Sequence, residues 1–420
     1  MSQYIVELMV KGYRAISMPI VLRNLDRYVA LFGDNAVGKS SLLRAVVLLG
    51  RLCEKHPTEL LGSGRPWPSE AFFDTFGEDP LMFNSAGTGE VQIVAKMTGR
   101  LGSLEVAFTI QRWDPNSIRI SCDQAITNGT NLMLEVEQAT SSLRSASAVS
   151  DPDLVDQASA RVGAAYQLLH QALEPVRVAI GQSPSVPVPD PTRAALFDAL
   201  SSTDIGLRNK VRAAFRRFGT LFPALGAGEV DVLGNPPTHP KDLAWLADSP
   251  PSVIDLDHLG GGVQSTVATV ASLVLSRSPI VCLEEPEAFV GARALMGLSS
   301  LFREATRNKL CEQIWVATHA VTLVGDDEPI VVLEKKDGIV AVRQGSAAQL
   351  GGPFSQPVAG PTVDKLGRLG QDGSVRLPAA IIERTGLRPG DFVYFVDEPE
   401  GARILTGVQM DATLSTSAEK

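Results

Sequence analysis

Residues 33–40 combine residue types and a spacing suited to binding a chain of phosphates. Their letters, GDNAVGKS, fit the pattern GxxxxGK[ST] in full, after an apolar run at 28–32 and before a helical pattern from Ser41. Glycines in such a loop let successive backbone N–H groups point at phosphate oxygens, while Lys39 reaches the β- and γ-phosphates and Ser40 binds Mg²⁺. The segment predicts a nucleoside-triphosphate site, with a chance glycine turn as the weaker alternative. The expected contacts are Gly33, Asn35, Ala36, Val37, Gly38, Lys39, Ser40 and Ser41.

Acidic residues and a histidine follow two further apolar runs. Glu284 and Glu285 end the run at 280–283, and His319 follows the run at 314–317. Glu284 suits a Mg²⁺ ion held through water, and Glu285 suits the positioning and activation of an attacking water. His319, at the carboxyl edge of a third parallel strand, is placed to sense a γ-phosphate. The alternatives are a solvated acidic turn and a structural histidine.

Three consecutive glycines, Gly260, Gly261 and Gly262, precede a second helical pattern at 266–275. Backbone N–H groups at a helix N-terminus make an anion cradle, and a flexible hinge is the equal alternative. One chain cannot easily bring both cradles to one nucleotide, whereas two chains in head-to-tail apposition can.

The order of these motifs resembles the ABC-type P-loop ATPases (AAA family ATPases) of the SMC, RecF-like and OLD-like groups, over residues 4–334. VKGYRAI looks like their N-terminal segment, with Arg14 matching its arginine, and the resemblance implies that Arg14 contacts the nucleotide. GDNAVGKSS has Ala36 where they have glycine. LGGGVQS resembles the signature loop, LEEPEAF the acidic Walker B segment, and ATHA the switch-histidine segment. A Q-loop glutamine is not evident, since Gln92 and Gln111 both fall inside strand patterns.

The resemblance implies an enzyme that converts ATP and water to ADP and phosphate, with Mg²⁺ as cofactor. It also implies a homodimer formed on ATP binding, in which Gly260, Gly261 and Gly262 of one chain complete the site of the other. Glu285 and His319 take the catalytic positions in this scheme.

The expected fold class is α/β: an ABC-type P-loop ATPase with an inserted helical lobe and a small β-rich C-terminal domain. The last of these, with GSVRLP and IIERTGLRPGDFV, is similar to an AbrB-type swapped-hairpin module. It carries six basic and six acidic residues between Lys365 and Arg403, which leaves DNA binding and simple dimerisation equally open. The expected boundaries are 1–135 and 253–345 for the two ATPase halves, 136–252 for the helical lobe, 346–362 for a linker, 363–408 for the module and 409–420 for a tail. Within these parts, the sequence predicts alternating strands at 89–112, a helix that starts at Pro152 with Asp151 as its N-cap, and an irregular segment at 236–251.

Composition limits the partners. The chain of 420 residues has 38 Lys and Arg against 47 Asp and Glu, a net charge of −9, so nucleic acid can be bound only by a local patch. A helical run at 207–218 is the strongest candidate for such a patch, and a solvated helix face is its alternative. The candidate nucleic-acid contacts are Arg208, Lys210, Arg212, Arg216 and Arg217.

No apolar run is long enough to span a membrane, and four distant cysteines indicate reduced thiols in a cytoplasmic protein.

The leading hypothesis is a cytoplasmic ATPase that dimerises on ATP and acts on DNA, in repair, chromosome maintenance or anti-phage defence. DNA and a separate nuclease or effector protein are the candidate partners. A different class is an ATP-gated DNA-binding regulator, of transcriptional or antitoxin type, that uses the AbrB-like tail. A transporter ATPase subunit fits the acidic motif and the large insertion less well.

Overall fold

The structure is a computed structural model, and the chain divides into two units, Met1–Ala347 and Ala348–Lys420. The described residues are 3–61, 65–84, 89–99, 102–149, 151–181, 187–216, 221–222, 225, 227–233, 243–248, 251–276, 278–308, 310–324, 329–350, 368–369, 375–376, 393–398 and 401–406. All site residues expected from the sequence, except Arg217, lie in the described part of the first unit.

An antiparallel sheet forms the N-terminal part of the first unit, with strand order β2-β1-β5-β6-β7-β4 and β8 paired to β7. Strand β5 alternates buried and partly exposed side chains, and its Val91, Ile93 and Ala95 are fully buried. This strand follows the period-2 pattern expected at 89–112, whereas residues 106–110 of β6 are all buried and do not alternate. The strands are β1 (Gln3–Lys11), β2 (Ile20–Leu22), β4 (Trp67–Pro68), β5 (Glu90–Gly99), β6 (Gly102–Asp114), β7 (Ser117–Thr127) and β8 (Thr130–Asn131).

The second sheet holds the segments expected to bind the nucleotide, and its strand order is β16-β15-β3-β14-β13-β9. Strands β15, β3, β14, β13 and β9 run parallel, and β16 is antiparallel to β15. The central strands are continuous apolar runs because both faces of the sheet are covered. The strands are β3 (Tyr28–Phe32), β9 (Val178–Ile180), β13 (Ile280–Glu284), β14 (Gln313–Thr318), β15 (Ile330–Lys336) and β16 (Ile339–Gly345).

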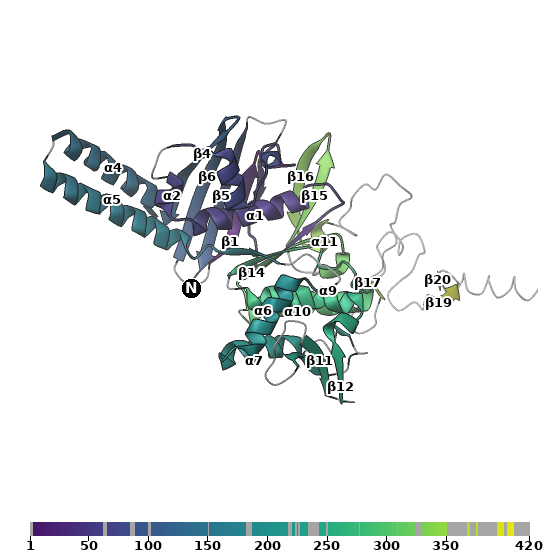
Figure 1. Ribbon diagram of the computed structural model, residues 1–420. Helices are drawn as coiled ribbons and strands as arrows, with labels where there is room; N and C mark the ends of the chain where they lie inside the picture. Colours follow the sequence, from purple (N-terminus) through teal and green to yellow (C-terminus); the bar gives the residue numbers. More distant parts are fainter. Residues whose placement is uncertain are drawn as a thin grey trace, which may run out of the picture. The chain divides into compact units, whose positions relative to one another are not determined.

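Helix α1 (Lys39–Glu54) lies in a hydrophobic core shared by the two sheets (Figure 1). Its buried residues belong to the same hydrophobic core as Cys282 and Trp315 of the parallel sheet and the buried residues of β1 and β5. Gln313 joins the sheets directly, since its side-chain amide donates to the carbonyl oxygens of Ile5 and Asp26 and accepts from the backbone N–H of Ile5. The phosphate loop is therefore anchored on a rigid double-sheet scaffold.

A second core contains helices α6 (Asp190–Ser201), α7 (Ile205–Phe215) and α9 (Gly261–Leu275) with a three-stranded antiparallel sheet. That sheet corrects one prediction, because residues 236–251 were expected to be irregular but include strand β11. Trp245 at the centre of β11 is fully buried, and pairing on both sides makes this Leu- and Ala-rich segment extended. The strands are β10 (Gly228–Val232), β11 (Leu243–Asp248) and β12 (Pro251–Asp255).

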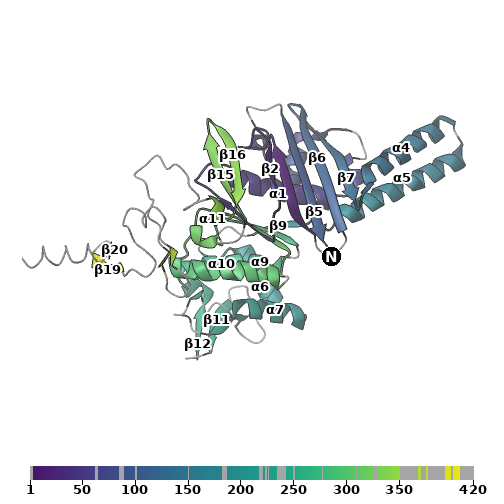
Figure 2. The same cartoon turned by 180° about the vertical axis from the view of Figure 1, so that it is seen from behind.

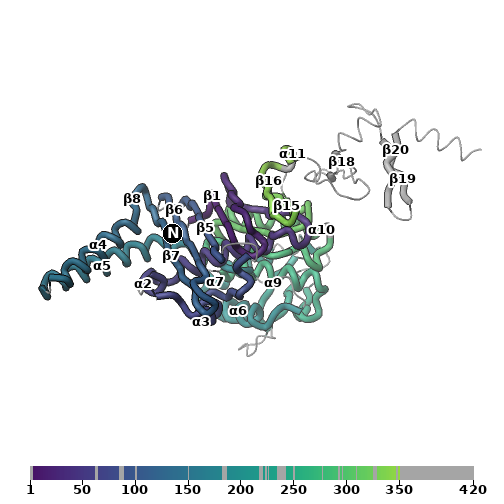
Figure 3. The backbone as a smooth tube through the Cα atoms, turned by 90° about the horizontal axis from the view of Figure 1, so that it is seen from above, coloured from purple at the N-terminus to yellow at the C-terminus, as the bar shows by residue number. Residues whose placement is uncertain are grey.

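Helices α4 (Leu132–Val149) and α5 (Pro152–Leu173) form a long antiparallel hairpin that extends away from the antiparallel sheet (Figures 1 and 3). Asp151 caps α5 as expected, since its carboxylate accepts from the backbone N–H groups of Asp153 and Leu154. Residues 136–252, for which a helical lobe is expected, thus hold most of this hairpin, then β9 of the parallel sheet, then most of the elements of the second core. The domain boundaries remain a prediction.

The remaining elements are short or peripheral, apart from α10, which packs on β14 and β3. Apart from the end of α11, only four strands are described in the second unit, so the AbrB-like module expected at 363–408 lies mostly outside the described residues. All four cysteines are buried free thiols, as the sequence suggests, and no described helix has the length and apolarity needed to cross a bilayer. The remaining elements are α2 (Pro57–Leu61), α3 (Ser69–Phe76), η1 (Pro80–Met82), η3 (Leu256–His258), α10 (Ala292–Arg307), η4 (Val321–Leu323), α11 (Ala347–Leu350), β17 (Arg368–Leu369), β18 (Val375–Arg376), β19 (Val393–Glu398) and β20 (Gly401–Thr406).

Candidate functional site

The phosphate loop connects the end of β3 to the start of α1, the setting predicted from the sequence. A Cβ atom at Gly33 would lie 2.5 Å from the carbonyl oxygen of Leu333, so only glycine fits at the first position of the loop. Ala36 has a φ of 62°, a left-handed conformation that favours the glycine found there in the resembled ATPases. Asn35 is exposed and Val37 buried, so the loop is held by its apolar residue and open on its polar side.

Lys39 is folded onto the loop. Its ammonium group donates to the carbonyl oxygen of Gly33 at 2.7 Å and to that of Asp34 at 2.9 Å. Burial lowers the pKa of Lys39, and the negative charges of Glu285 and Glu287 oppose that shift. Phosphate oxygens can replace both carbonyl acceptors, so this cation is available to a nucleotide.

Ser40 and Glu284 meet across the gap between α1 and β13. The hydroxyl of Ser40 donates a hydrogen bond to Oε1 of Glu284. Among the described residues no group of three or more His, Cys, Asp or Glu side chains could hold a metal ion. Mg²⁺ is usually bound by one or two protein oxygens together with substrate phosphates, so this hydroxyl–carboxylate pair fits Mg²⁺ accompanied by a nucleotide.

Glu285 and His319 face each other from the ends of β13 and β14, with Oε1 and Nδ1 3.9 Å apart. Glu285 has a φ of 46°, a strained backbone conformation for glutamate, and its N–H donates to the carbonyl oxygen of Ala317 at 2.8 Å. The two side chains are 45% and 55% exposed, respectively. Strand order therefore brings both groups to the open edge beside the phosphate loop, where a water molecule can enter.

Glu287 is the residue that sequence reasoning missed. Its Oε1 accepts hydrogen bonds from the hydroxyl of Thr318 at 2.6 Å and from the backbone N–H of His319 at 2.9 Å, and it lies 3.4 Å from Nδ1 of His319. The residue is 7% exposed, and its Oε2 has no hydrogen-bond partner among the described residues. Glu287 thus fixes the segment that carries the histidine. Nothing in the sequence indicates this contact, because it joins two loops about thirty residues apart.

The glycine loop at 260–262 begins α9, with Gly260 as the N-cap. A Cβ atom at Gly262 would lie 2.6 Å from the carbonyl oxygen of Phe289. The hydroxyl of Ser265 donates a hydrogen bond to the carbonyl oxygen of Ala288 at 3.0 Å. The loop is therefore fixed to the segment that follows the two acids. Figures 1 and 2 show α9 and α1 on opposite sides of the parallel sheet. Within one chain, Gly260–262 and the phosphate loop thus start helices on different faces.

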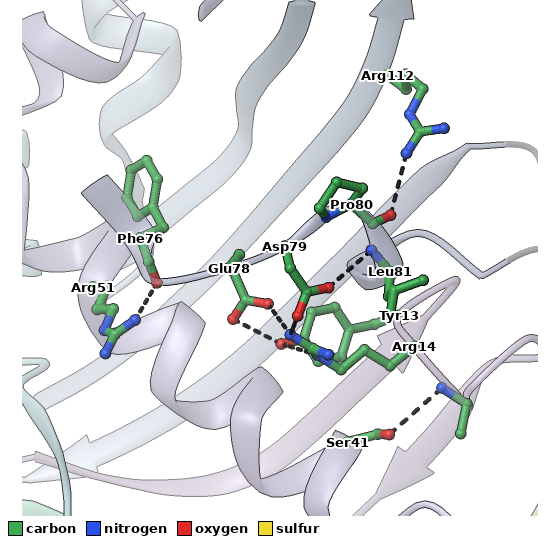
Figure 4. Close-up of polar contacts among 11 residues, drawn as sticks. Tyr13, Arg14, Ser41, Arg51, Phe76, Glu78, Asp79, Pro80, Leu81 and Arg112 are labelled. Atoms are coloured by element: carbon green, nitrogen blue, oxygen red, sulfur yellow. Dashed lines mark hydrogen bonds and ion pairs between the residues drawn. The ribbon is translucent and has the colours of Figure 1, made fainter. Parts of the chain in front are cut away.

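Arg14 is held in an acidic network (Figure 4). Its guanidinium donates to Glu78 at 2.7 Å, to Asp79 at 3.2 Å and to the hydroxyl of Tyr13 at 3.2 Å. Burial alone would lower the pKa of Arg14, but the hydrogen bonds and charges of Tyr13 and Glu78 outweigh it and raise the pKa. Ser41 accepts from the backbone N–H of the residue after Arg14 at 3.5 Å, which links this network to α1. The structure therefore shows Arg14 turned toward carboxylates.

The basic stretch at 208–217 lies on and after α7, in the second core. Arg212 forms ion pairs with Asp231 and, at 3.7 Å, with Glu229, and Arg216 donates to Glu229 at 3.1 Å. Two of the five cations are thus matched by carboxylates of β10, which weakens the local positive field.

The other three cations of the stretch are Arg208, Lys210 and Arg217. Arg208 and Lys210 form no ion pair within the described residues, and Arg217 lies outside them. Lys210 is close enough to Cys311 to lower its pKa slightly, although burial dominates and raises that pKa to about 12. Neither Arg208 nor Lys210 forms a hydrogen bond or ion pair with the phosphate loop within the described part of the chain.

Comparison with known proteins gives structural likenesses only. The SMC head domain from Thermotoga maritima has 14% identity and a TM-score of 0.46, covering 82% of this chain and 100% of that one. An Smc head with an extended coiled coil, bound to the C-terminal domain of ScpA and derived from Pyrococcus furiosus, has 12% identity and a TM-score of 0.47, covering 83% and 97%. An SmcHead bound to the C-winged helix domain of ScpA has 14% identity and a TM-score of 0.49, covering 82% and 99%.

No family model matches the chain, and no curated protein matches it. The structural likenesses have TM-scores below 0.5, so the function proposed below rests on the residues of this chain.

Proposed function

We propose that the protein is an ATPase that hydrolyses ATP to ADP and phosphate with Mg²⁺ as cofactor. One observation carries the proposal: Lys39, the Ser40–Glu284 pair and the Glu285–His319 pair converge on one edge of the sheet from three neighbouring strands. A cation, a metal-binding oxygen pair and a general base beside a phosphate loop are the parts that phosphoryl transfer to water needs.

Each residue then has a stated task. The backbone N–H groups of the loop and the ammonium of Lys39 bind the phosphates. Ser40 and Glu284 would hold Mg²⁺, which would supply neutralisation of phosphate charge. Glu285 accepts a proton from the attacking water and orients it. His319 contacts the γ-phosphate and is itself oriented by Glu287.

The second part of the proposal is a homodimer formed on ATP binding. The glycine loop forms the N-terminus of α9, where backbone N–H groups can bind an anion, yet it lies on the face of the sheet opposite α1 (Figure 2). A second copy of the chain in head-to-tail apposition can place its Gly260, Gly261 and Gly262 against the γ-phosphate bound by the first. Each dimer then holds two composite sites.

Glu285→Gln tests the enzymatic proposal. The amide keeps the size of the side chain but cannot take a proton, so we expect Mg²⁺-dependent phosphate release to fall about 10²- to 10⁴-fold. ATP binding, measured by equilibrium dialysis, should stay within about twofold, because the ground-state phosphate contacts are made by other residues. Wild-type protein that releases no phosphate from ATP, or a variant that keeps the wild-type rate, contradicts the proposal.

A role on DNA is the third part, with repair, chromosome maintenance or anti-phage defence as the expected settings. It is supported by Arg208 and Lys210, the described cations of α7 that form no ion pair. The double variant Arg208→Ala/Lys210→Ala should weaken binding to duplex DNA and reduce the slope of log K against log salt by about 2. An unchanged slope rules out this helix, and loss of DNA binding only on removal of residues 362–420 would favour the regulator that binds DNA through its tail.

A further inference from the structure

A cavity of about 360 Å³ lies at the root of the α4–α5 hairpin, away from the residues of the ATP site. Its walls come from α2, β7, α4 and α5, and Figure 3 shows these elements meeting at the base of the hairpin. The volume is in the range of small-molecule sites, which is about 300–1,000 Å³. The cavity is therefore large enough for one ligand of mononucleotide size.

One side of the cavity is apolar. Leu60, Ile120 and Val136 are buried lining residues, and the ring of Tyr166 adds a flat surface. Burial raises the pKa of Tyr166, which keeps its hydroxyl protonated and able to donate a hydrogen bond. This side suits the ring of a heterocycle or another flat apolar body.

The other side is cationic. Arg65, Arg119 and Arg144 line it from three different segments, and Glu137 is the single acidic residue of the described lining. The guanidinium of Arg119 lies over the ring of Trp113, 5.0 Å from its centroid, which leaves its outward N–H groups available. Arg119 and Arg144 form no ion pair within the described part of the chain, in contrast to Arg14 and Arg212.

We propose that this cavity binds a small organic phosphate with a flat apolar body, such as a mononucleotide. Arg119 and Arg144 hold the phosphate, because guanidinium groups match phosphate oxygens in bidentate geometry. Tyr166 and the apolar wall hold the ring. A ligand here bridges β7 and both helices of the hairpin, so it fixes the base of the hairpin. A limited concave volume with an apolar wall favours one small ligand over a polynucleotide, which needs an extended row of cations.

The test measures binding of thymidine 5′-monophosphate to the full-length protein by equilibrium dialysis, with thymidine as the probe that lacks the phosphate. We expect binding to the wild type, at least about tenfold weaker binding of thymidine, and a similar loss for Arg119→Ala/Arg144→Ala. Ser141→Trp is an independent variant that should also lose binding of the probe. Ser141 is an exposed residue of the cavity lining, so a larger side chain there fills the cavity while all arginines remain.

Two controls separate this site from others. Arg161→Ala removes an exposed arginine of α5 that does not line the cavity, and Lys39→Ala disables the phosphate loop; both should bind the probe like the wild type. The proposal is overturned if the wild type fails to bind the probe at roughly 1 mM, if thymidine binds equally well, or if only Lys39→Ala loses binding. It is also overturned if the arginine pair affects a single-stranded DNA oligonucleotide but not the mononucleotide, which would indicate a nucleic-acid surface.

Discussion

The two halves of the candidate site are built in different ways. The phosphate loop is one continuous segment between β3 and α1, and its contacts, such as that of Lys39 to Gly33, are local. The acid–histidine half comes from the ends of β13 and β14, and the buried carboxylate of Glu287 holds it together. A continuous segment carries its geometry in its own backbone, whereas an assembled half depends on strand order and on one side chain that never touches the nucleotide.

This difference predicts how each half fails. Damage to the loop should weaken nucleotide binding itself, because the loop makes the phosphate contacts in the ground state. Damage to the assembled half should leave binding intact and slow turnover, since its groups act on the attacking water.

Lys39→Ala should have the largest effect on the loop half. It removes a buried ammonium that bonds the phosphates, and we expect ATP affinity to fall by about 2–3 kcal/mol, or about 30- to 150-fold. Equilibrium dialysis with labelled ATP measures this loss, and Lys335→Ala, an exposed lysine of β15, is the matched control. An unchanged affinity in Lys39→Ala would mean that nucleotide binds elsewhere.

Glu287→Leu should disrupt the acid–histidine half of the site, and its effect on activity should be smaller than that of Lys39→Ala on ATP affinity. It removes the acceptor shared by Thr318 and His319, so the histidine loses its fixed position, and kcat should fall about 10- to 100-fold with KM nearly unchanged. Glu287→Gln keeps an acceptor oxygen and should restore most of the rate. If the two variants lose activity equally, or if both raise KM alone, Glu287 does not position His319.

The sequence predicts much of the loop half and less of the assembled half. The apolar run at 28–32, the glycines and the following helix are local signals, and β3 and α1 begin and end close to where they are expected. Glu284, Glu285 and His319 are also indicated, since each follows an apolar strand. Glu287 is not, because its role depends on a contact with Thr318 that only folding creates.

The same limit explains the missed strand. Residues 243–248 read Leu-Ala-Trp-Leu-Ala-Asp, which has no alternation and favours helix by composition, yet they form the middle strand β11. Burial of Trp245 and pairing with β10 and β12 decide the conformation there. In the basic stretch, the carboxylates that pair with Arg212 and Arg216 lie on β10, beyond the reach of a local charge count.

A mixing experiment tests the composite ATP site most directly. Lys39→Ala disables the phosphate loop, and Gly262→Ala disables the glycine loop because its Cβ would lie 2.6 Å from the carbonyl oxygen of Phe289. Each variant alone should be inactive, but a dimer of the two has one site with both loops intact. An equal mixture should therefore recover about a quarter of the wild-type ATPase rate. Recovery of activity would confirm that two chains share each site, and a mixture as inactive as its components would contradict it.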